Sequence, residues 1–135
     1  MLARREHSAA ELKQKLAARG FAGETVESVL AGLRAEGLQS DARFAEAWVH
    51  HRIERGYGPV RIRQELRERG VPADLIDRYL DEKDPDWFAR LSELRRRKYG
   101  TSTPSSYREQ ARQSRFLYQR GFSSEHIRRL FRADD

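Results

Sequence analysis

Apolar and aromatic residues recur along the chain with a helical period. In the stretch 40–71, Phe44 and Trp48 are four positions apart, with further apolar residues beside them, which is typical of one face of an amphipathic helix. The segment 56–59, Gly-Tyr-Gly-Pro, then interrupts the pattern, because glycine accepts left-handed dihedrals and proline fixes φ at a value that suits a helix start. The apolar spacing resumes at Ile62 and Leu66. This stretch therefore predicts two helices joined by a tight turn.

The segment that ends the second of these helices occurs three times. Leu-x-x-Arg-Gly, followed by an apolar residue, occupies 16–21, 66–71 and 117–122, so its glycines are 50 and then 51 positions apart. Apolar residues also match in the helix after each glycine, as at Val26, Ile76 and Ile127. Such spacing predicts a threefold helical repeat, and no alternating run favours a strand instead.

The repeat predicts the domain organisation and the fold class. Residues 1–37 form a partial first repeat, in which 1–6 are the last turns of a first helix, 38–83 form the second, and 84–135 form the third with a short acidic tail. Outside 40–71, helices are expected over 8–19, 23–36, 73–82, 85–98, 104–120 and 124–132. Since no helix can bury its apolar face alone, neighbouring repeats are expected to stack. The predicted fold is all-α, an elongated array of three tandem three-helix repeats.

Local signals support these helices and predict which side chains are buried. Ser8 and Glu11 have the spacing of a capping box, in which each side chain accepts a hydrogen bond from the backbone N–H of the other. All four prolines fall at expected helix starts. His51 shares the apolar face of its helix and is expected in the core. Other residues expected to be buried include Leu12, Val29, Leu30, Trp87, Leu91, Tyr107, Leu117, Tyr118 and Leu130.

Composition narrows the function classes. The chain has no cysteine, so neither a disulfide nor a thiolate metal site can form. It has no apolar run of the roughly 20 residues that cross a bilayer and no signal segment, which predicts a cytoplasmic protein without a membrane partner. The net charge of +6 is uneven, since residues 84–132 alone carry +7. A basic third repeat favours a polyanionic partner such as nucleic acid, although a solvated, salt-bridged surface would have the same composition.

Catalysis has little support in the sequence. The four histidines are scattered, and the adjacent His50 and His51 would point about 100° apart on a helix. The Gly-Tyr-Gly segment lacks the Lys-Ser/Thr and the preceding strand of a phosphate-binding loop. The carboxylates are spaced as helix caps or as ion-pair partners of arginine rather than as an acid and a base. We therefore expect neither enzymatic activity nor a metal or cofactor.

Basic side chains are the stronger candidates for function. An arginine can bind a phosphate or a carboxylate through two parallel hydrogen bonds, and an exposed tyrosine can stack on a nucleic-acid base. Each arginine taken alone could equally solvate its own helix face. The residues predicted to contact a partner are Arg52, Arg55, Tyr57, Arg61, Arg63 and Arg67 in the second repeat, and Arg95, Arg96, Arg97, Lys98, Arg112 and Arg115 in the third.

An ordered set of motifs resembles the RecX family of bacterial regulatory proteins. The motifs are Arg4-Arg5-Glu6-His7-Ser8, Asp41-x-x-Phe44-Ala45-x-x-x-Val49, Glu65-Leu66 with Arg69-Gly70-Val71, Arg97-Lys98-Tyr99-Gly100, and Arg115 to Phe122. The resemblance covers nearly the whole chain and implies three tandem three-helix repeats. It also implies that the chain binds RecA and the RecA filament on single-stranded DNA, lying in the filament groove. Such proteins inhibit the ATPase, strand-exchange and coprotease activities of RecA, without a cofactor, and so modulate recombination and DNA repair in the SOS response.

Departures from the family pattern leave other functions open. His50-His51 stands where a more basic pair is expected, and fewer residues precede Arg4 than family members usually have. The runner-up function is a basic helical protein that binds single- or double-stranded DNA without RecA, although no helix carries an evident set of base-reading side chains. The third possible function is that of a helical adaptor for an acidic protein. The chain is expected to be a monomer, since nothing in it resembles a heptad seam.

Overall fold

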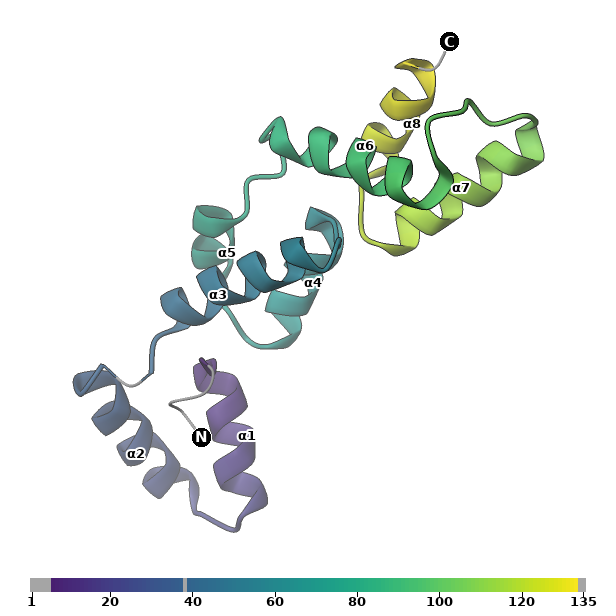
Figure 1. The fold of residues 1–135 in the computed structure, drawn as a ribbon. Helices are drawn as coiled ribbons and strands as arrows, with labels where there is room; N and C mark the ends of the chain where they lie inside the picture. The colour runs from purple at the N-terminus through teal and green to yellow at the C-terminus, as the bar shows by residue number, and fades with distance from the viewer. Residues whose placement is uncertain (1–5, 38, 134–135) are drawn as a thin grey trace. The chain divides into compact units, whose positions relative to one another are not determined.

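The computed structural model describes residues 6–37 and 39–133, and every regular element among them is an α-helix (Figure 1). The helices are α1 (Ala9–Ala18), α2 (Gly23–Ala35), α3 (Asp41–Glu54), α4 (Pro59–Glu68), α5 (Ala73–Tyr79), α6 (Asp86–Tyr99), α7 (Tyr107–Gln119) and α8 (Ser124–Ala133). The all-α prediction is confirmed. Glu6 precedes α1 and is not helical, whereas the rest of the helical turns predicted over 1–6 and the acidic tail at 134–135 lie outside the described residues.

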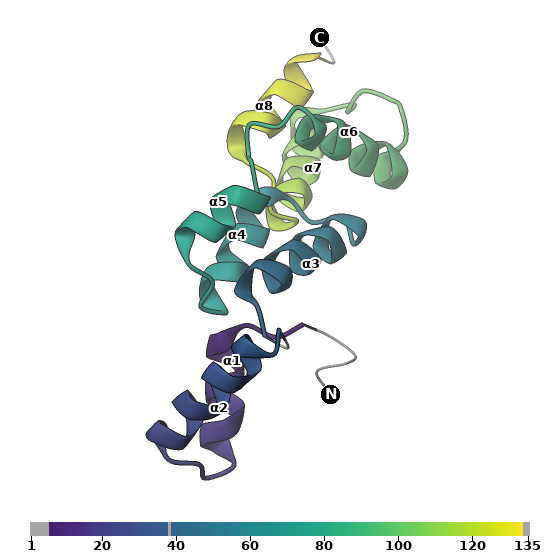
Figure 2. The ribbon, with the colours of Figure 1, turned by 90° about the vertical axis from the view of Figure 1, so that its left-hand side faces the viewer.

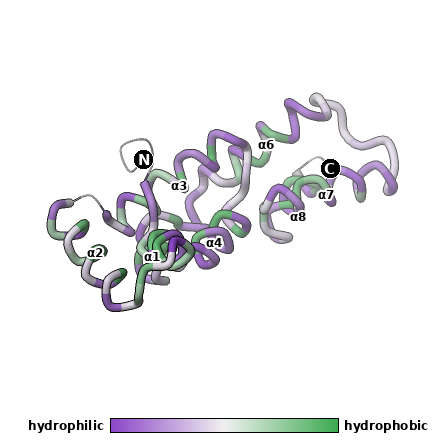
Figure 3. Tube along the Cα trace, turned by 90° about the horizontal axis from the view of Figure 1, so that it is seen from below, coloured by the Kyte–Doolittle hydropathy of each residue, from purple (hydrophilic) through white to green (hydrophobic). Residues whose placement is uncertain are grey.

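The described residues divide into two units. The N-terminal unit holds residues 6–50 and 64–79, and the C-terminal unit holds 51–63 and 80–133, so α3 and α4 contribute to both. In the N-terminal unit α1 and α2 lie side by side, and in the C-terminal unit α6, α7 and α8 pack together (Figures 1 and 2). Apolar positions alternate with hydrophilic ones along the helices (Figure 3). None of the described helices combines the length and the apolarity that a membrane span requires.

The threefold motif closes α1, α4 and α7 in the same way. Gly20, Gly70 and Gly121 have φ of 90°, 78° and 101°, a left-handed conformation that glycine adopts without steric cost. The residue after each glycine donates its N–H to the carbonyl of the motif's leucine, as Val71 does to Leu66 at 3.0 Å. The glycine itself donates to the carbonyl three residues earlier. Together these bonds are the Schellman motif, which satisfies carbonyls at a helix C-terminus and explains the spacing within each copy.

The N-terminal unit is tied together at the start of α1. The predicted capping box is confirmed: Ser8 Oγ accepts from the Glu11 N–H at 3.1 Å, and Glu11 Oε1 accepts from the Ser8 N–H at 3.2 Å. The Ser8 hydroxyl also donates to the Arg69 carbonyl at 2.7 Å, and Asp41 accepts from the Ala9 N–H at 2.9 Å. These bonds join the start of α1 to the start of α3 and to the residue that follows α4. The apolar core of the unit contains Leu12, Val26, Leu30, Phe44, Ala45, Val49, Leu66, Val71 and Ile76.

The C-terminal unit contains two glycine turns that fit into one another. The Gly58 N–H donates to the Arg120 carbonyl at 2.7 Å, and the Val60 N–H donates to the Gly121 carbonyl at 2.9 Å. A Cβ atom on Gly58 would lie 2.5 Å from the carbonyl carbon and oxygen of Gly121, so only glycine allows this approach. The turn between α3 and α4 is thereby fixed on the turn between α7 and α8. The apolar core of the unit contains Ile62, Leu80, Trp87, Leu91, Leu117, Phe122, Ile127, Leu130 and Phe131.

In α2 and α3, two residues predicted for the core, Val29 and His51, lie at the surface. His51 is exposed, because at the end of α3 the half-buried positions are Arg52 and Ile53, and Arg52 packs on the ring of Tyr57. At this end of α3 the covered positions are therefore Arg52 and Ile53 and not His51. The prediction of a core histidine is wrong. Val29 is 40% exposed, since α2 turns other apolar residues toward α1.

The start of α7 also differs from the prediction. The helix begins at Tyr107 with Ser106 as its N-cap, and the Ser106 hydroxyl accepts a hydrogen bond from the Glu109 N–H at 3.1 Å. Since a serine cap fixes the first turn, Pro104 lies in the preceding loop and does not start the helix.

The buried face of α7 is another one than predicted. Tyr107 is 86% exposed and Tyr118 is 62% exposed. Leu117 is buried as predicted, but the other buried position is Gln113 and not a tyrosine, because Gln113 accepts a hydrogen bond from the buried side chain of Arg95. A polar pair between α6 and α7 thus decides which side of α7 faces the core.

Candidate functional site

Three arginines surround the ring of Tyr57, which lies on the turn between α3 and α4. The guanidinium carbons of Arg52, Arg61 and Arg120 lie 3.9, 4.2 and 4.2 Å from the ring centroid, within the range of cation–π attraction. Arg52 comes from α3, Arg61 from α4, and Arg120 from the C-cap of α7. The structure therefore brings three of the predicted residues together and adds Arg120 to them.

Sequence reasoning misses Arg120, although the repeat contains a signal for it. Arg120 is the arginine of the Leu-x-x-Arg-Gly motif, and its counterpart Arg69 lies 4.0 Å from the ring centroid of Trp48 in the N-terminal unit. Arg120 also donates to the carbonyls of Arg55 and Gly56, the latter at 3.3 Å. In both repeats the motif's arginine stacks on an aromatic ring, so the Tyr57 cluster supports the fold as well as concentrating positive charge.

The other predicted arginines of the second repeat are dispersed. Arg63 forms an ion pair with Glu82 at 2.8 Å and donates to the Leu80 carbonyl at 3.2 Å, so it fixes the segment that follows α5. Arg55 and Arg67 are exposed, but Arg55 belongs to the C-terminal unit and Arg67 to the N-terminal unit.

The basic run 95–98 at the end of α6 does not form one patch. Arg95 is only 7% exposed, and its Nε donates to Gln113 Oε1 at 3.1 Å. Its guanidinium carbon lies 5.0 Å from the ring centroid of Phe131. Arg95 is thus held inside the C-terminal unit, whereas the sequence places it with its neighbours in an exposed cationic run.

Glu93 offsets part of the exposed charge that follows Arg95. Its carboxylate forms ion pairs with Arg96 at 2.6 Å and with Arg97 at 3.1 Å. The hydrogen bond from Arg96, the strongest influence, lowers the pKa of the Glu93 carboxyl from 4.5 to about 2. Glu93 is therefore ionised throughout the physiological pH range and neutralises one of the two guanidinium charges beside it.

The pKa of Glu93 is expected near 2 in a carbon-13 NMR titration of the carboxyl groups, and in the variant Arg96→Gln it should rise toward 4.5. Because the pKa in the folded state lies below that of the unfolded chain, this pairing stabilises the fold above about pH 4.5 and ceases to do so as the pH falls through about 2. The same pKa in both proteins would contradict the assigned role of Arg96.

A groove of ≈ 510 Å³ is lined by the end of α6 and by α7. It brings the predicted residues Lys98, Arg112 and Arg115 together. Tyr99 and Phe116 meet there edge to face, with ring centroids 5.8 Å apart, and burial raises the pKa of the Tyr99 hydroxyl. The other lining residues outside the predicted set are Arg108 and Gln119. A cationic groove with aromatic side chains is suited to a polyanion.

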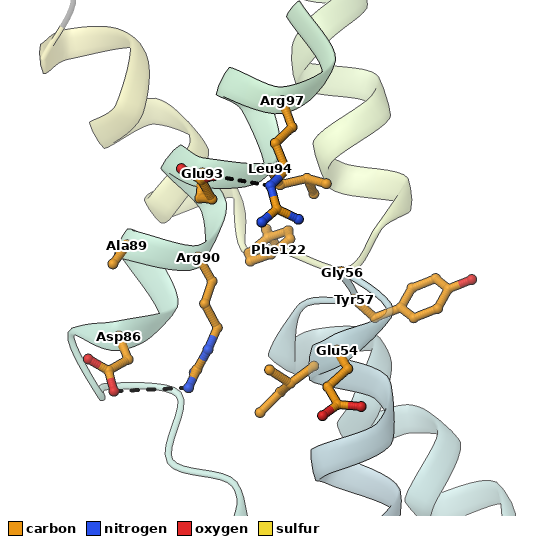
Figure 4. A pocket seen from close by; sticks show the side chains of 11 residues that line it. Glu54, Gly56, Tyr57, Asp86, Ala89, Arg90, Glu93, Leu94, Arg97 and Phe122 are labelled. Carbon is orange, nitrogen blue, oxygen red and sulfur yellow. Dashed lines mark hydrogen bonds and ion pairs between the residues drawn. The ribbon is translucent and has the colours of Figure 1, made fainter. Parts of the chain in front are cut away.

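A second hollow in the C-terminal unit is lined by three carboxylates, one of them Glu54, and by only two arginines (Figure 4). Arg90 pairs with Asp86 at 4.0 Å, and Arg97 pairs with Glu93 at 3.1 Å. The ring of Tyr57 points away from this hollow. It is therefore a poorer site for a polyanion than the groove at Tyr99. Over 6–37 and 39–133, the structure shows no cluster of histidine and carboxylate side chains that could hold a metal ion.

Comparison with known proteins assigns the whole chain to one family. Models of the first, second and third three-helix domains of RecX match residues 1–33, 40–80 and 84–131. The regulatory protein RecX of Halorhodospira halophila (strain DSM 244 / SL1) is 47% identical over 135 residues, which are 100% of this chain and 84% of that protein. The regulatory protein RecX of Pseudomonas entomophila (strain L48) is also 47% identical over 135 residues and is covered to 87%.

Solved structures support the same assignment. A crystal structure of regulatory protein RecX has a TM-score of 0.80 and 26% identity, covering 96% of this chain and 66% of that one. The crystal structure of RecX from Lactobacillus salivarius shares the fold, with a TM-score of 0.74 and 21% identity over 99% of this chain and 89% of that one. The expected tandem three-helix domains are confirmed by the three domain matches. The chain belongs to the RecX family of regulatory proteins.

Proposed function

We propose that the chain binds RecA and the RecA–single-stranded DNA filament and inhibits the ATPase, strand-exchange and coprotease activities of RecA. The observation that carries the proposal is the family match over all three domains, together with 47% identity to RecX proteins across 100% of the chain. The chain would restrain RecA by binding rather than by catalysis, and so modulate recombination and DNA repair. It would act as a monomer in the cytoplasm, where RecA filaments form.

The proposed domain divisions follow the sequence repeat, at 1–37, 38–83 and 84–135. Within them, we assign filament contacts to the exposed or groove-lining cations, because these can reach a carboxylate of RecA or a phosphate of the bound DNA. They are Arg55, Arg67, Arg96, Arg97, Lys98, Arg112 and Arg115, with Arg52, Tyr57 and Arg61 contributing as a cluster. Arg63 and Arg95 are assigned to the fold, since both are engaged within the C-terminal unit.

The inhibition would be steric and electrostatic. A basic surface attracts the polyanionic filament, and the bound chain then occupies space that repressor or a second DNA strand requires. Complementary charge raises the rate of encounter more than it raises the final affinity. Because salt screens exposed charges, the proposal implies that the rate of association with the filament falls as salt is added, and that the affinity falls to a smaller extent.

Reversing the charge of two groove residues tests the contact surface. The variant Arg112→Glu/Arg115→Glu is expected to bind RecA filaments on single-stranded DNA about tenfold more weakly, because two exposed charge contacts are lost. The measurement is fluorescence anisotropy of labelled chain titrated with filaments held in a non-hydrolysable ATP analogue. Arg128→Glu/Arg132→Glu, two exposed reversals on α8 outside the groove, is the control matched in charge and should bind almost normally. Wild-type affinity in the double variant would show that Arg112 and Arg115 are not part of the contact surface. Failure of the wild-type chain to bind filaments would refute the proposed function.

A further inference from the structure

A relay of hydrogen bonds runs from the core of the C-terminal unit to the groove at Tyr99. Arg95 and Gln113 are buried, with 7% and 3% of their surface exposed, and Arg95 Nε donates to Gln113 Oε1 at 3.1 Å. Gln113 Nε2 in turn donates to Glu109 Oε1 at 3.3 Å. The same carboxylate oxygen accepts from Arg112 Nη2 at 3.1 Å. Glu109 therefore links a buried polar pair to a cation that lines the groove.

Glu109 is held on the inner side of this relay. Its backbone N–H donates to the N-cap Ser106 Oγ at 3.1 Å, which fixes its place in the first turn of α7, and its carboxylate is fixed by Gln113. The Glu109 side chain is 28% exposed, whereas the Arg112 side chain is 66% exposed. Arg112 can therefore reach out toward a partner, while Glu109 stays anchored to the core.

Glu109 is also the one carboxylate in its part of the sequence. Residues 101–123 contain four arginines and no acidic residue besides Glu109. The described residues that line the groove include no carboxylate. The cations that line it are Lys98, Arg108, Arg112 and Arg115. Glu109 thus neutralises one of these four cations from a position behind the groove.

We propose that Glu109 is a tethered competitor for Arg112, which lowers the affinity of the groove for its anionic partner and speeds the partner's release. The inference rests on the proposed function, because it concerns the regulation of the same filament contact. A phosphate or carboxylate of the filament that takes the Arg112 guanidinium must first displace Glu109. Because Gln113 holds the displaced carboxylate in place, Glu109 stays beside Arg112 and re-forms the ion pair as soon as the partner loosens.

The opposite role, in which Glu109 orients Arg112 for the partner, has less support. Arg112 has a second contact that holds it at the groove, because its guanidinium carbon lies 5.9 Å from the ring centroid of Tyr99, within the range of cation–π attraction. An arginine binds a phosphate or carboxylate best through two parallel N–H donors, and Nη2 of Arg112 already donates to Glu109. The contact with Glu109 therefore takes a donor and a charge away from the groove.

The test is the variant Glu109→Gln, whose side-chain amide oxygen can still accept from Gln113 and so keeps the relay. RecA filaments held in a non-hydrolysable ATP analogue are titrated into labelled chain, and fluorescence anisotropy gives the affinity and the dissociation rate. Glu109→Gln is expected to bind about three- to fivefold more tightly, the effect of removing a competing surface ion pair, mainly through slower dissociation. Glu125→Gln is the control matched in charge, because Glu125 is exposed at the start of α8 and outside the groove. Its affinity should change by less than about twofold, since salt screens a distant charge.

A double-mutant cycle separates competition from a general effect of charge or of fold. In an Arg112→Gln background, Glu109→Gln should gain no more affinity than Glu125→Gln does, because the competitor has lost its cation. Three results would overturn the inference: equal affinity of Glu109→Gln and Glu125→Gln, weaker filament binding by Glu109→Gln than by the wild-type chain, or the full gain in the Arg112→Gln background. The second of these would assign Glu109 to the orientation of Arg112.

Inorganic polyphosphate, a polyanion that involves no RecA, distinguishes failure of this inference from failure of the proposed function. Filament binding by the wild-type chain without a gain in Glu109→Gln would refute the competitor alone. A gain in Glu109→Gln on polyphosphate, in a chain that does not bind filaments, would support the competitor and refute the proposed function. No binding of either polyanion by the wild-type chain would overturn both.

Discussion

Replacing Gly58 by alanine is expected to destabilise the C-terminal unit by about 3 kcal/mol, because a methyl group there meets backbone rather than a flexible side chain. The added Cβ would lie 2.5 Å from the carbonyl carbon and oxygen of Gly121 and 2.7 Å from the Phe122 nitrogen. To relieve the overlap the two turns must separate, which breaks the hydrogen bonds that Gly58 and Val60 donate.

Urea unfolding followed by tryptophan fluorescence measures this effect in the unit concerned. The chain has two tryptophans, Trp48 in the N-terminal unit and Trp87 in the C-terminal unit, so a Trp48→Phe background reports the latter alone. Gly32→Ala is the matched control: Gly32 lies inside α2 with nothing within 4 Å of an added Cβ, and alanine there should stabilise its helix by about 0.5–1 kcal/mol, an effect that is followed with Trp48 retained, because Trp48 lies in the same unit. A Gly58→Ala variant as stable as wild type would contradict the close fit of the two turns.

Removing the Arg95 side chain is expected to cost the C-terminal unit about 2–3 kcal/mol. Arg95→Ala leaves the buried Gln113 Oε1 without its donor and removes the guanidinium from beside Phe131, and an unsatisfied buried acceptor together with lost packing has a cost of this size. The measurement is the same unfolding experiment with Trp87 as the probe.

The neighbouring residue Arg97 supplies the control for Arg95. Its side chain is 75% exposed and pairs with Glu93 at the surface, so Arg97→Ala should change the free energy of unfolding by less than about 0.5 kcal/mol. Equal stability of the two variants would contradict the separation of the run into one core residue and its exposed neighbours.

The helices and their ends were predictable because local chemistry determines them. The Leu-x-x-Arg-Gly motif is a Schellman closure, whose bonds run between residues at most five positions apart, and the box at Ser8 and Glu11 is equally local. Such signals can be recognised in the sequence alone, because they do not depend on contacts with distant residues.

The orientation of two helices was not predictable in the same way. A helical period shows that a helix is amphipathic, but α7 offers both a tyrosine line and a Gln113–Leu117 line. Which of them is buried depends on Arg95, eighteen positions before Gln113 in the sequence. Likewise, His51 is exposed because Arg52 is drawn to Tyr57, a contact across the following turn.

The same distinction, between features set by local sequence and features set by contacts between distant residues, applies to the candidate site. The grouping of Arg112 with Arg115 follows from spacing on one helix and is confirmed by their shared groove. Arg120 contacts Tyr57 although the two residues are sixty-three positions apart in the sequence. Neither spacing nor composition predicts such a contact. The sequence therefore indicates that the third repeat is basic, whereas the structure is needed to separate its surface cations from those that hold the fold.

Action on the filament is tested by ATP hydrolysis by RecA on single-stranded DNA, titrated with this chain, beside binding of the chain to the same DNA without RecA. We expect hydrolysis to be suppressed at chain concentrations well below those that occupy the naked DNA. Suppression only where the bare DNA is already saturated, or no suppression at all, would contradict action on the filament and would favour a basic helical protein that binds DNA without RecA.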